Sequence, residues 1–256
     1  MKNFMLCMLF ALVTPSVAFA DTTLLWLVNK ESPLPPDYTP PHLTVQNGIT
    51  ANKHALEAFA KMEQGIKSAG ITNLKLQSAY RPYQHQENIF NKKVNSLGPD
   101  HHSLEAARIT AAQTVQPPGA SEHQTGLALD VTTDGSLTEN FATTPAGEWL
   151  QNNCHHYGFI IRYPKDKTQT TQIIYEPWHL RYVGHPHASI MYNLNLTLEE
   201  YHQYIREIGH YLFWCKEGLG DYYLVSYYTT PVGDGEVSAT CINGVGYIVS
   251  IKKSSG

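Results

Sequence analysis

The feature that most constrains this chain is a carboxylate inside an apolar segment, Leu127-Ala128-Leu129-Asp130-Val131. A short apolar run of this kind predicts a buried strand. Burying an ionised carboxylate without a partner is costly, so a positive group must lie beside Asp130 in the folded protein. That group can be an arginine or a metal ion, and this stretch alone leaves both open.

Apolar spacing predicts helices and strands in alternation up to residue 208. Residues 51–69 carry apolar side chains three and four residues apart, as on one face of a helix. Thr197 and Glu200 have the spacing of a capping box, which predicts a last core helix over about 198–208. The same patterns predict helices at 84–94, 103–115 and 145–157, and strands at 24–28, 74–78, 127–131, 159–163 and 173–175. The predicted helices and strands are joined by short links but do not follow a regular βαβ repeat, which favours an α+β domain.

Two segments differ from this alternation. Residues 32–41 are too rich in proline for a helix or a central strand, so we expect an extended segment over the domain surface, or else a plain linker. Residues 211–251 are rich in Tyr, Val, Thr and Gly, with turn signals at 233–235 and 243–244, and predict two or three hairpin strands. We expect 209–256 to be a β-rich appendage that binds the wall, covers the core or simply packs as β-structure.

The first 20 residues have the features of a signal peptide. Lys2 is positive, residues 4–13 are apolar, and Ala18-Phe19-Ala20 has the form of a cleavage site before Asp21. The apolar run is shorter than the about 20 residues that a membrane-spanning helix needs. We therefore expect export to the periplasm, the cell-wall space or the medium, with a retained N-terminal anchor as the alternative.

Charge, apolar run lengths and cysteine spacing argue against nucleic-acid binding, a later membrane span and a thiolate zinc site. A net charge of −4 gives no basic footprint for nucleic acid, and no later apolar run reaches bilayer length. None of Cys154, Cys215 and Cys241 lies in a C-x-x-C pattern, which argues against a thiolate zinc site. Cys215 and Cys241 could form a disulfide worth about 3 kcal/mol, which leaves Cys154 as a buried free thiol.

A second constellation is Glu176-Pro177-Trp178-His179, which we expect at the end of the strand 173–175. A His and a Glu three residues apart allow one to bind a metal while the other contacts water. With His123 and Asp130, His179 completes three nitrogen or oxygen ligands, and Glu176 remains free. A catalytic zinc needs three protein ligands and an open position for water.

A third constellation, Ser78-Ala79-Tyr80-Arg81, lies where a strand gives way to a helix. A guanidinium at such a place can hold a substrate carboxylate or a developing oxyanion. For an isolated arginine, a structural salt bridge is the alternative.

Three sequence motifs together resemble those of one family. S-x-H-x-x-G-x-A-x-D at 121–130, E-x-W-H at 176–179 and S-x-Y-R at 78–81 are similar to those of VanY-type D-alanyl-D-alanine carboxypeptidases. These enzymes belong to a wider group with lysostaphin-like peptidases and the hedgehog signalling domain. The resemblance covers about 24–208, so we expect a zinc carboxypeptidase domain over 21–208. It implies a central antiparallel sheet with flanking helices.

The resemblance also implies a role for each site residue. His123, Asp130 and His179 correspond to the zinc ligands, Glu176 to the general base and Arg81 to the clamp on the substrate and transition state. Ser121 and Gln86 match positions that line the substrate pocket. The implied reaction releases the C-terminal D-alanine of peptidoglycan stem peptides.

Three other functions fit the same motifs. An L,D-carboxypeptidase would remove D-alanine from the tetrapeptide stem with the same residues, and a bridge-cutting endopeptidase is chemically accessible. A zinc-stabilised binding module is the alternative of a different class. Glu176 distinguishes an enzyme from a binding module, because only an enzyme needs a carboxylate that is free of the metal. Oligomeric state does not follow from the sequence.

Overall fold

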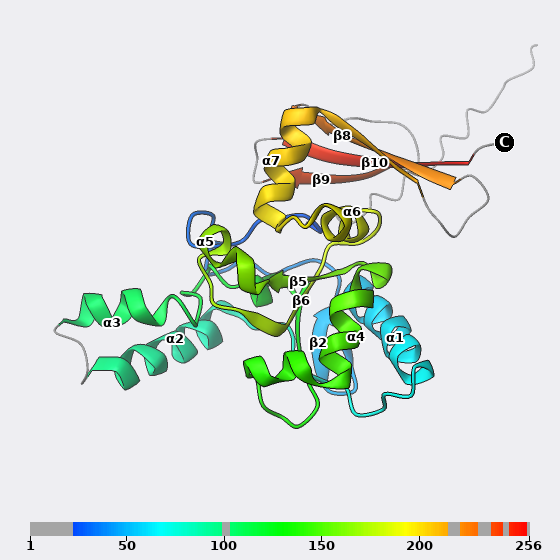
Figure 1. Cartoon of the computed structure of the whole chain (residues 1–256). Coiled ribbons are helices and arrows are strands. Elements are labelled where there is room, and N and C mark those ends of the chain that lie inside the picture. Colours follow the sequence, from blue (N-terminus) through cyan, green and yellow to red (C-terminus); the bar gives the residue numbers. More distant parts are fainter. Residues whose placement is uncertain (1–22, 99–102, 215–220, 230–236, 243–245, 255–256) are drawn as a thin grey trace, which may run out of the picture.

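The computed structural model describes residues 23–98, 103–214, 221–229, 237–242 and 246–254. Two four-stranded sheets and a short hairpin are combined with helices around them (Figure 1). The strands are β1 (Leu43–Gln46), β2 (Ile49–Asn52), β3 (Lys75–Ser78), β4 (Ala128–Thr132), β5 (Phe159–Tyr163), β6 (Glu176–Tyr182), β7 (His210–Trp214), β8 (Asp221–Tyr228), β9 (Val237–Ile242) and β10 (Gly246–Ser254). The α-helices are α1 (Lys53–Ser68), α2 (Tyr83–Leu97), α3 (Leu104–Ala111), α4 (Pro145–Asn153), α5 (Thr168–Thr171), α6 (His187–Leu194) and α7 (Leu198–Ile208). The 3-10 helices are η2 (Glu122–Thr125), η3 (Glu139–Thr143), η4 (Cys154–Tyr157) and η5 (Lys165–Lys167).

The central sheet has the order β3-β4-β6-β5, and every pair in it is antiparallel. Helices α1 and α4 pack on one of its faces and form the main hydrophobic core with Leu129, Val131 and Leu180. Because successive side chains of a strand point to opposite faces, Asp130 and His179 point away from that core. The α+β architecture with a central antiparallel sheet is therefore confirmed.

A second core joins the C-terminal strands to the rest of the molecule. The strands β7-β8-β10-β9 form an antiparallel sheet, with α7 alongside it and α6 between it and the central sheet (Figure 1). Val225 and Ile248 of this sheet pack in one cluster with Leu198, Tyr201 and Ile205 of α7. Four strands occur where two or three were expected, because the segment forms a complete sheet against α7.

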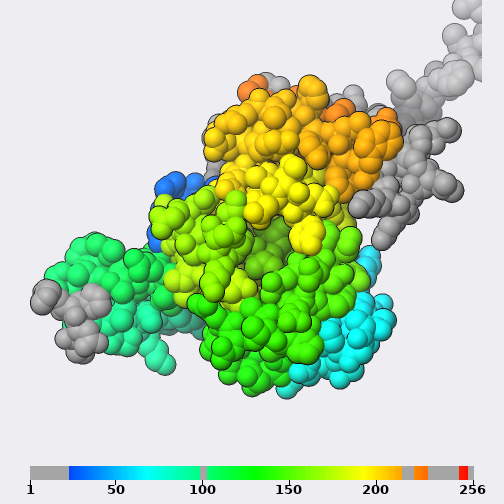
Figure 2. All heavy atoms as spheres, in the orientation of Figure 1, coloured from blue at the N-terminus to red at the C-terminus, as the bar shows by residue number. Residues whose placement is uncertain are grey.

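A helical hairpin projects from the side of the molecule. Helices α2 and α3 extend away from the sheets (Figures 1 and 2). They are held together by a small core of their own, formed by Phe90, Val94, Ala107 and Ala111. Both helices were predicted from sequence, although α3 ends earlier than the expected residue 115.

Several predictions of local structure are confirmed. The first helix buries the expected apolar face, and α7 begins after Thr197 with both hydrogen bonds of the capping box to Glu200. Residues 33–41 contain no helix or strand, and Leu34 donates its backbone N–H to the carbonyl oxygen of Gly119. Cys154 is buried and free.

Two predicted strands are wrong. Residues 24–28 form no strand, because the carbonyl oxygens of Leu24 and Trp26 accept hydrogen bonds from the Arg181 guanidinium, both at 3.0 Å, in place of a neighbouring strand. Residues 173–175 are irregular as well, since the N–H of Ile174 bonds to the carbonyl oxygen of Gln113. The strand begins only at Glu176, so Glu176 and His179 lie within β6 and not after a strand.

A hairpin of two strands and one helix were not predicted from the sequence. Strands β1 and β2 form a hairpin through Asn47 and Gly48, whose φ angles of 52° and 79° fit a turn that needs two positive values. The Asn-Gly pair was a usable signal for it. The apolar helix α6 was missed too.

Some predictions fall on residues that are not described. The signal peptide over 1–20, the turns at 233–235 and 243–244, Cys215 and the side chain of Cys241 lie outside the described residues. Within the described ranges, no helix is long and apolar enough to cross a membrane.

Candidate active site

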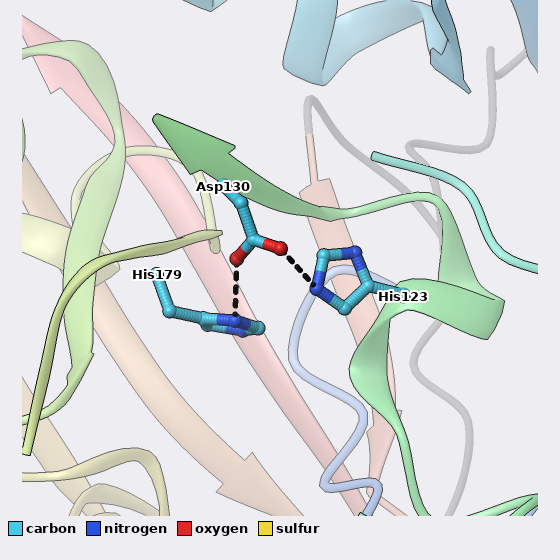
Figure 3. A group of neighbouring side chains, drawn as sticks. All are labelled: His123, Asp130 and His179. Atoms are coloured by element: carbon cyan, nitrogen blue, oxygen red, sulfur yellow. Dashed lines mark ion pairs between the residues drawn. The ribbon is translucent and has the colours of Figure 1, made fainter. Parts of the chain in front are cut away.

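Two histidines and an aspartate meet on the open face of the central sheet. His179 of β6 lies directly opposite Asp130 of β4 in the antiparallel register, and His123 reaches the same point from η2. Asp130 Oδ2 is 3.1 Å from His123 Nε2, and Asp130 Oδ1 is 3.1 Å from His179 Nδ1. Figure 3 shows the carboxylate between the two imidazole rings. The structure therefore brings together the three residues that the sequence analysis proposed as ligands.

The orientation of His123 is fixed from behind. Its Nδ1 lies 2.6 Å from the carbonyl oxygen of Ala79, which can only accept a hydrogen bond. Nδ1 therefore carries a proton, and in the neutral ring Nε2 keeps the lone pair with which it can bind a metal beside Asp130. The backbone N–H of Arg81 in turn donates to the carbonyl oxygen of His123, so η2 and the end of β3 are held together.

The three side chains form a strongly coupled charged group. Burial opposes ionisation of Asp130, but His123 and His179 outweigh it and hold the pKa of Asp130 well below its ordinary value. Burial alone would lower the pKa of His179, but the nearby carboxylates of Asp130, Glu122 and Glu176 favour its charged form and raise this pKa to about 9. These three carboxylates concentrate negative charge around the buried His179 ring, and a bound cation would neutralise this charge.

The donor set fits a divalent metal. One ligand atom from each of His123, Asp130 and His179 lies within 4.8 Å of the others, and all three residues are buried. Asp130 Oδ1 is buried, and its 3.1 Å ion-pair contact with His179 Nδ1 does not have the geometry of a hydrogen bond, so a cation would satisfy this oxygen. Two imidazoles and one carboxylate are ligands that zinc accepts, with a fourth position left open. These residues can hold a metal ion.

Glu176 is a carboxylate beside this group. Its Oε2 lies 3.7 Å from His179 Nδ1. Burial raises the pKa of Glu176 to about 7. The negative charge of Asp130 adds to this rise, whereas the positive charges of His179 and Arg81 oppose it. A carboxylate with a pKa near neutrality can take up and release a proton at physiological pH.

Arg81 faces the same pocket from the end of β3. Its Nη1 donates to Gln86 Oε1 at 2.7 Å, its Nη2 donates to Ser78 Oγ at 3.3 Å, and Nη2 lies 3.7 Å from Asp130 Oδ2. Gln86 is itself held, since its Nε2 donates to the carbonyl oxygen of Gln116 at 2.6 Å. The guanidinium is thus oriented by neutral groups, and its nearest carboxylate belongs to the candidate metal group.

All of these residues border one pocket of about 210 Å³. Ser121 lines it too, and so do several apolar and aromatic side chains: Ile89, Val115, Leu137, Tyr163, Ile173 and Trp178. The cavity is large enough for a small terminal group of a peptide. Every site residue predicted from sequence lines this pocket.

The sequence analysis missed a set of buried charges behind the pocket. Glu122, Arg162 and Arg181 are each at most 1% exposed, and both arginines form ion pairs with Glu122. Burial favours neutral Glu122, but both arginines hold its pKa far below the ordinary value. The available signal was an arginine inside each of two apolar strand segments, at 159–163 and 179–183.

Residues 48–185 match the family model of VanY, D-alanyl-D-alanine carboxypeptidase. The chain belongs to this family. It is therefore a peptidase, and the resemblance inferred from three short motifs is confirmed.

Two relatives show how far the similarity extends. The bifunctional D-Ala-D-Ala dipeptidase and D-Ala-D-Ala carboxypeptidase VanXYC of Enterococcus gallinarum is 34% identical over 190 residues, covering 72% of this chain and 95% of the relative. A D-alanyl-D-alanine carboxypeptidase of Enterococcus faecium is 36% identical over 163 residues, which are 64% of this chain but only 47% of that protein.

Solved structures of VanY-type enzymes have the same fold. The vancomycin resistance D,D-pentapeptidase VanY, solved as a variant with Zn(II), is 35% identical with a TM-score of 0.61, covering 69% of this chain and 97% of that one. The LdcB LD-carboxypeptidase is 38% identical with a TM-score of 0.63, covering 72% and 87%.

A third structure extends to the C-terminal strands. The D,D-dipeptidase VanXYg, bound to a D-Ala-D-Ala phosphinate analogue, is 26% identical with a TM-score of 0.73 and covers 90% of this chain and 94% of that one. Residues 1–208 are fewer than nine-tenths of the chain, so this match must include part of 209–256. The β-rich segment therefore has a counterpart that the sequence analysis did not recognise.

Proposed function

We propose that this protein is a zinc carboxypeptidase that releases the C-terminal D-alanine of peptidoglycan stem peptides. The observation that carries the proposal is the largely buried carboxylate of Glu176, whose side chain is 12% exposed and whose Oε2 lies 3.7 Å from His179 Nδ1, beside a His-Asp-His group that can hold a metal. A module that used zinc only for stability would need the three ligands but no free carboxylate with a pKa of about 7.

We assign a role to each residue of the pocket. His123, Asp130 and His179 would hold zinc, which when bound supplies a nucleophile at neutral pH by lowering the pKa of water to about 7. Glu176 would accept the proton of the attacking water and deliver it to the leaving amine. Such a carboxylate must remain outside the ligand set.

Arg81 would stabilise the negative charge that develops on the scissile carbonyl oxygen or bind the terminal carboxylate. Gln86 orients the Arg81 guanidinium through a 2.7 Å hydrogen bond and borders the pocket, where it and Ser121 would contact the substrate. Removing one donor of this kind costs about 3 kcal/mol of transition-state stabilisation in comparable sites.

The stereochemistry at the penultimate residue gives a second candidate. An L,D-carboxypeptidase would act on the tetrapeptide stem with the same catalytic groups. The specific observation in its favour is the similarity to the LdcB LD-carboxypeptidase, whose 38% identity to this chain is no lower than the 35% of the D,D-pentapeptidase. Both reactions release D-alanine, and they differ only in the residue whose carbonyl is attacked.

The test is a set of defined substrates. Purified mature protein is loaded with zinc and incubated with tri-, tetra- and pentapeptide stems, with a chelator-treated sample as the control. Mass spectrometry should detect loss of one alanine from the pentapeptide for the D,D reaction, or from the tetrapeptide for the L,D reaction. Absence of product from every substrate at full zinc occupancy would refute the proposal.

The domain organisation and location are part of the proposal. We propose that residues 1–20 are removed during export, that 21–208 form the peptidase domain and that 209–256 form an appendage. Peptidoglycan lies outside the cytoplasmic membrane, so an enzyme acting on it must be exported. N-terminal sequencing of the protein recovered from outside the cytoplasm should begin near Asp21, and an intact N-terminus in that fraction would contradict cleavage.

A further inference from the structure

A cluster of buried ions lies directly behind the candidate metal group. Glu122 Oε1 accepts hydrogen bonds from Arg162 Nε at 2.8 Å and lies 2.9 Å from Arg181 Nη1. Arg162 also makes a two-pronged contact with Glu199 of α7, at 2.9 and 2.6 Å. Stability alone gives a weak reason for such a cluster, because apolar side chains of similar volume often stabilise a core equally well.

The two oxygens of Glu122 have different surroundings. Oε1 lies against both arginines, whereas Oε2 is buried and has no hydrogen-bond partner. His179 Nε2 lies 3.9 Å from Oε2, and that nitrogen is also buried and without a hydrogen-bond partner. Two complementary orphaned atoms therefore face each other, and a shift of about 1 Å would bring them to hydrogen-bond distance.

The other ring nitrogen of His179 lies on the side where a metal would bind. Nδ1 points at Asp130 Oδ1, 3.1 Å away, and at Glu176 Oε2, 3.7 Å away. A neutral imidazole has one N–H and one lone pair, so a proton kept on Nε2 leaves the lone pair on Nδ1. His123 has the reverse arrangement, with its proton kept on Nδ1 by the carbonyl oxygen of Ala79.

We propose that Glu122 is a positioning residue for His179. Its Oε2 accepts the Nε2–H of His179, which fixes the tautomer and ring orientation that present Nδ1 to the metal. Arg162 and Arg181 keep Glu122 charged and held on the far side of the ring, where it cannot become a ligand itself. This inference depends on the proposed function for the metal, but it concerns a residue behind the ligands and not one of them.

Partners behind a metal-binding histidine typically change metal affinity by about 10- to 100-fold. We therefore expect Glu122→Gln to lower the zinc affinity by that factor, measured by competition with a chromophoric chelator. The amide can still accept a hydrogen bond but lacks the charge that strengthens it.

The matched control is Glu199→Gln. Glu199 belongs to the same ion cluster and pairs with the same Arg162, but no contact joins it to His179 in the described part of the chain. We expect this variant to lower the melting temperature while zinc affinity stays within twofold of the wild type. Equal losses of affinity in both variants, or unchanged affinity in Glu122→Gln, would overturn the proposal.

A second measurement needs no variant and guards against misfolding of Glu122→Gln. Nitrogen-15 NMR of the imidazoles in the zinc-loaded wild type should show His179 protonated at Nε2 and metal-bound at Nδ1. Coordination through Nε2 would refute the positioning role. A wild-type protein that binds no zinc would instead overturn the proposed function and this inference with it, so the two failures are distinguishable.

Discussion

Glu176→Gln provides the sharpest test of the site, because activity and stability should change in opposite directions. Without its proton acceptor, the enzyme should lose about 10²- to 10⁴-fold in kcat. Zinc affinity should be retained, since Glu176 is assigned no place among the ligands. The change is nearly isosteric, so it removes a charge and leaves the packing of the pocket unchanged.

The stability gain can be worked from the pKa of Glu176. Burial raises this pKa to about 7 from an ordinary 4.5, and each pKa unit is worth about 1.4 kcal/mol. Since the folded pKa is the higher one, ionised Glu176 costs the metal-free fold up to about 3 kcal/mol above pH 7 and nothing below pH 4.5. Glutamine mimics the protonated form and should recover this free energy.

The assay is denaturant unfolding of chelator-treated protein at pH 8 and pH 4.5, together with kcat of zinc-loaded protein. Glu176→Gln should be more stable than the wild type at pH 8 only. The exposed Glu148→Gln on α4 serves as the control: it should leave kcat unchanged and, because Glu148 lies in the first turn of the helix, should lower stability at pH 8 by no more than about 1 kcal/mol. Retained turnover would refute the role of Glu176 as base, and equal stabilities at pH 8 would refute the reasoning from its burial.

Three further predictions concern other parts of the molecule. Chelator-treated wild type should lose stability between pH 7 and 9. The pKa of His179 is raised to about 9 in the folded protein, so its protonated ring stabilises the fold fully below pH 6.5, and this stabilisation is lost as the ring loses its proton. A His179→Gln variant should show no such loss in denaturant titrations. Burial raises the pKa of the Cys154 thiol to about 12, so peptide mapping after treatment with a thiol reagent should find Cys154 unmodified until the protein unfolds, and rapid labelling of the native state would contradict its burial. Gly147→Ala should destabilise the fold by about 1–3 kcal/mol although alanine favours helices, because its Cβ would overlap the carbonyl oxygen of Phe141, whereas Gly98→Ala has open space and should be neutral or stabilising in the same unfolding assay.

The sequence by itself determined much of the site and its supporting elements. Local rules suffice where the signal is local: the apolar spacing of α1, the capping box of Thr197 and Glu200, and the apolar run around Asp130. The costly burial of one carboxylate required a positive partner before any coordinates were known. The three motifs then supplied the family.

Tertiary structure decided how these groups are charged and connected. The sequence left open whether an arginine or a metal ion lies beside Asp130. In the structure Arg81 lies beside this carboxylate, and so do two histidines that can hold a metal with it. The strand expected at 24–28 is replaced by carbonyl contacts to Arg181, more than 150 residues away. Hydrogen bonds between distant segments and the burial of a charge depend on the packed chain as a whole. For that reason the register that sets His179 opposite Asp130, the raised pKa of Glu176 and the position of Glu122 behind His179 could not be read from local pattern.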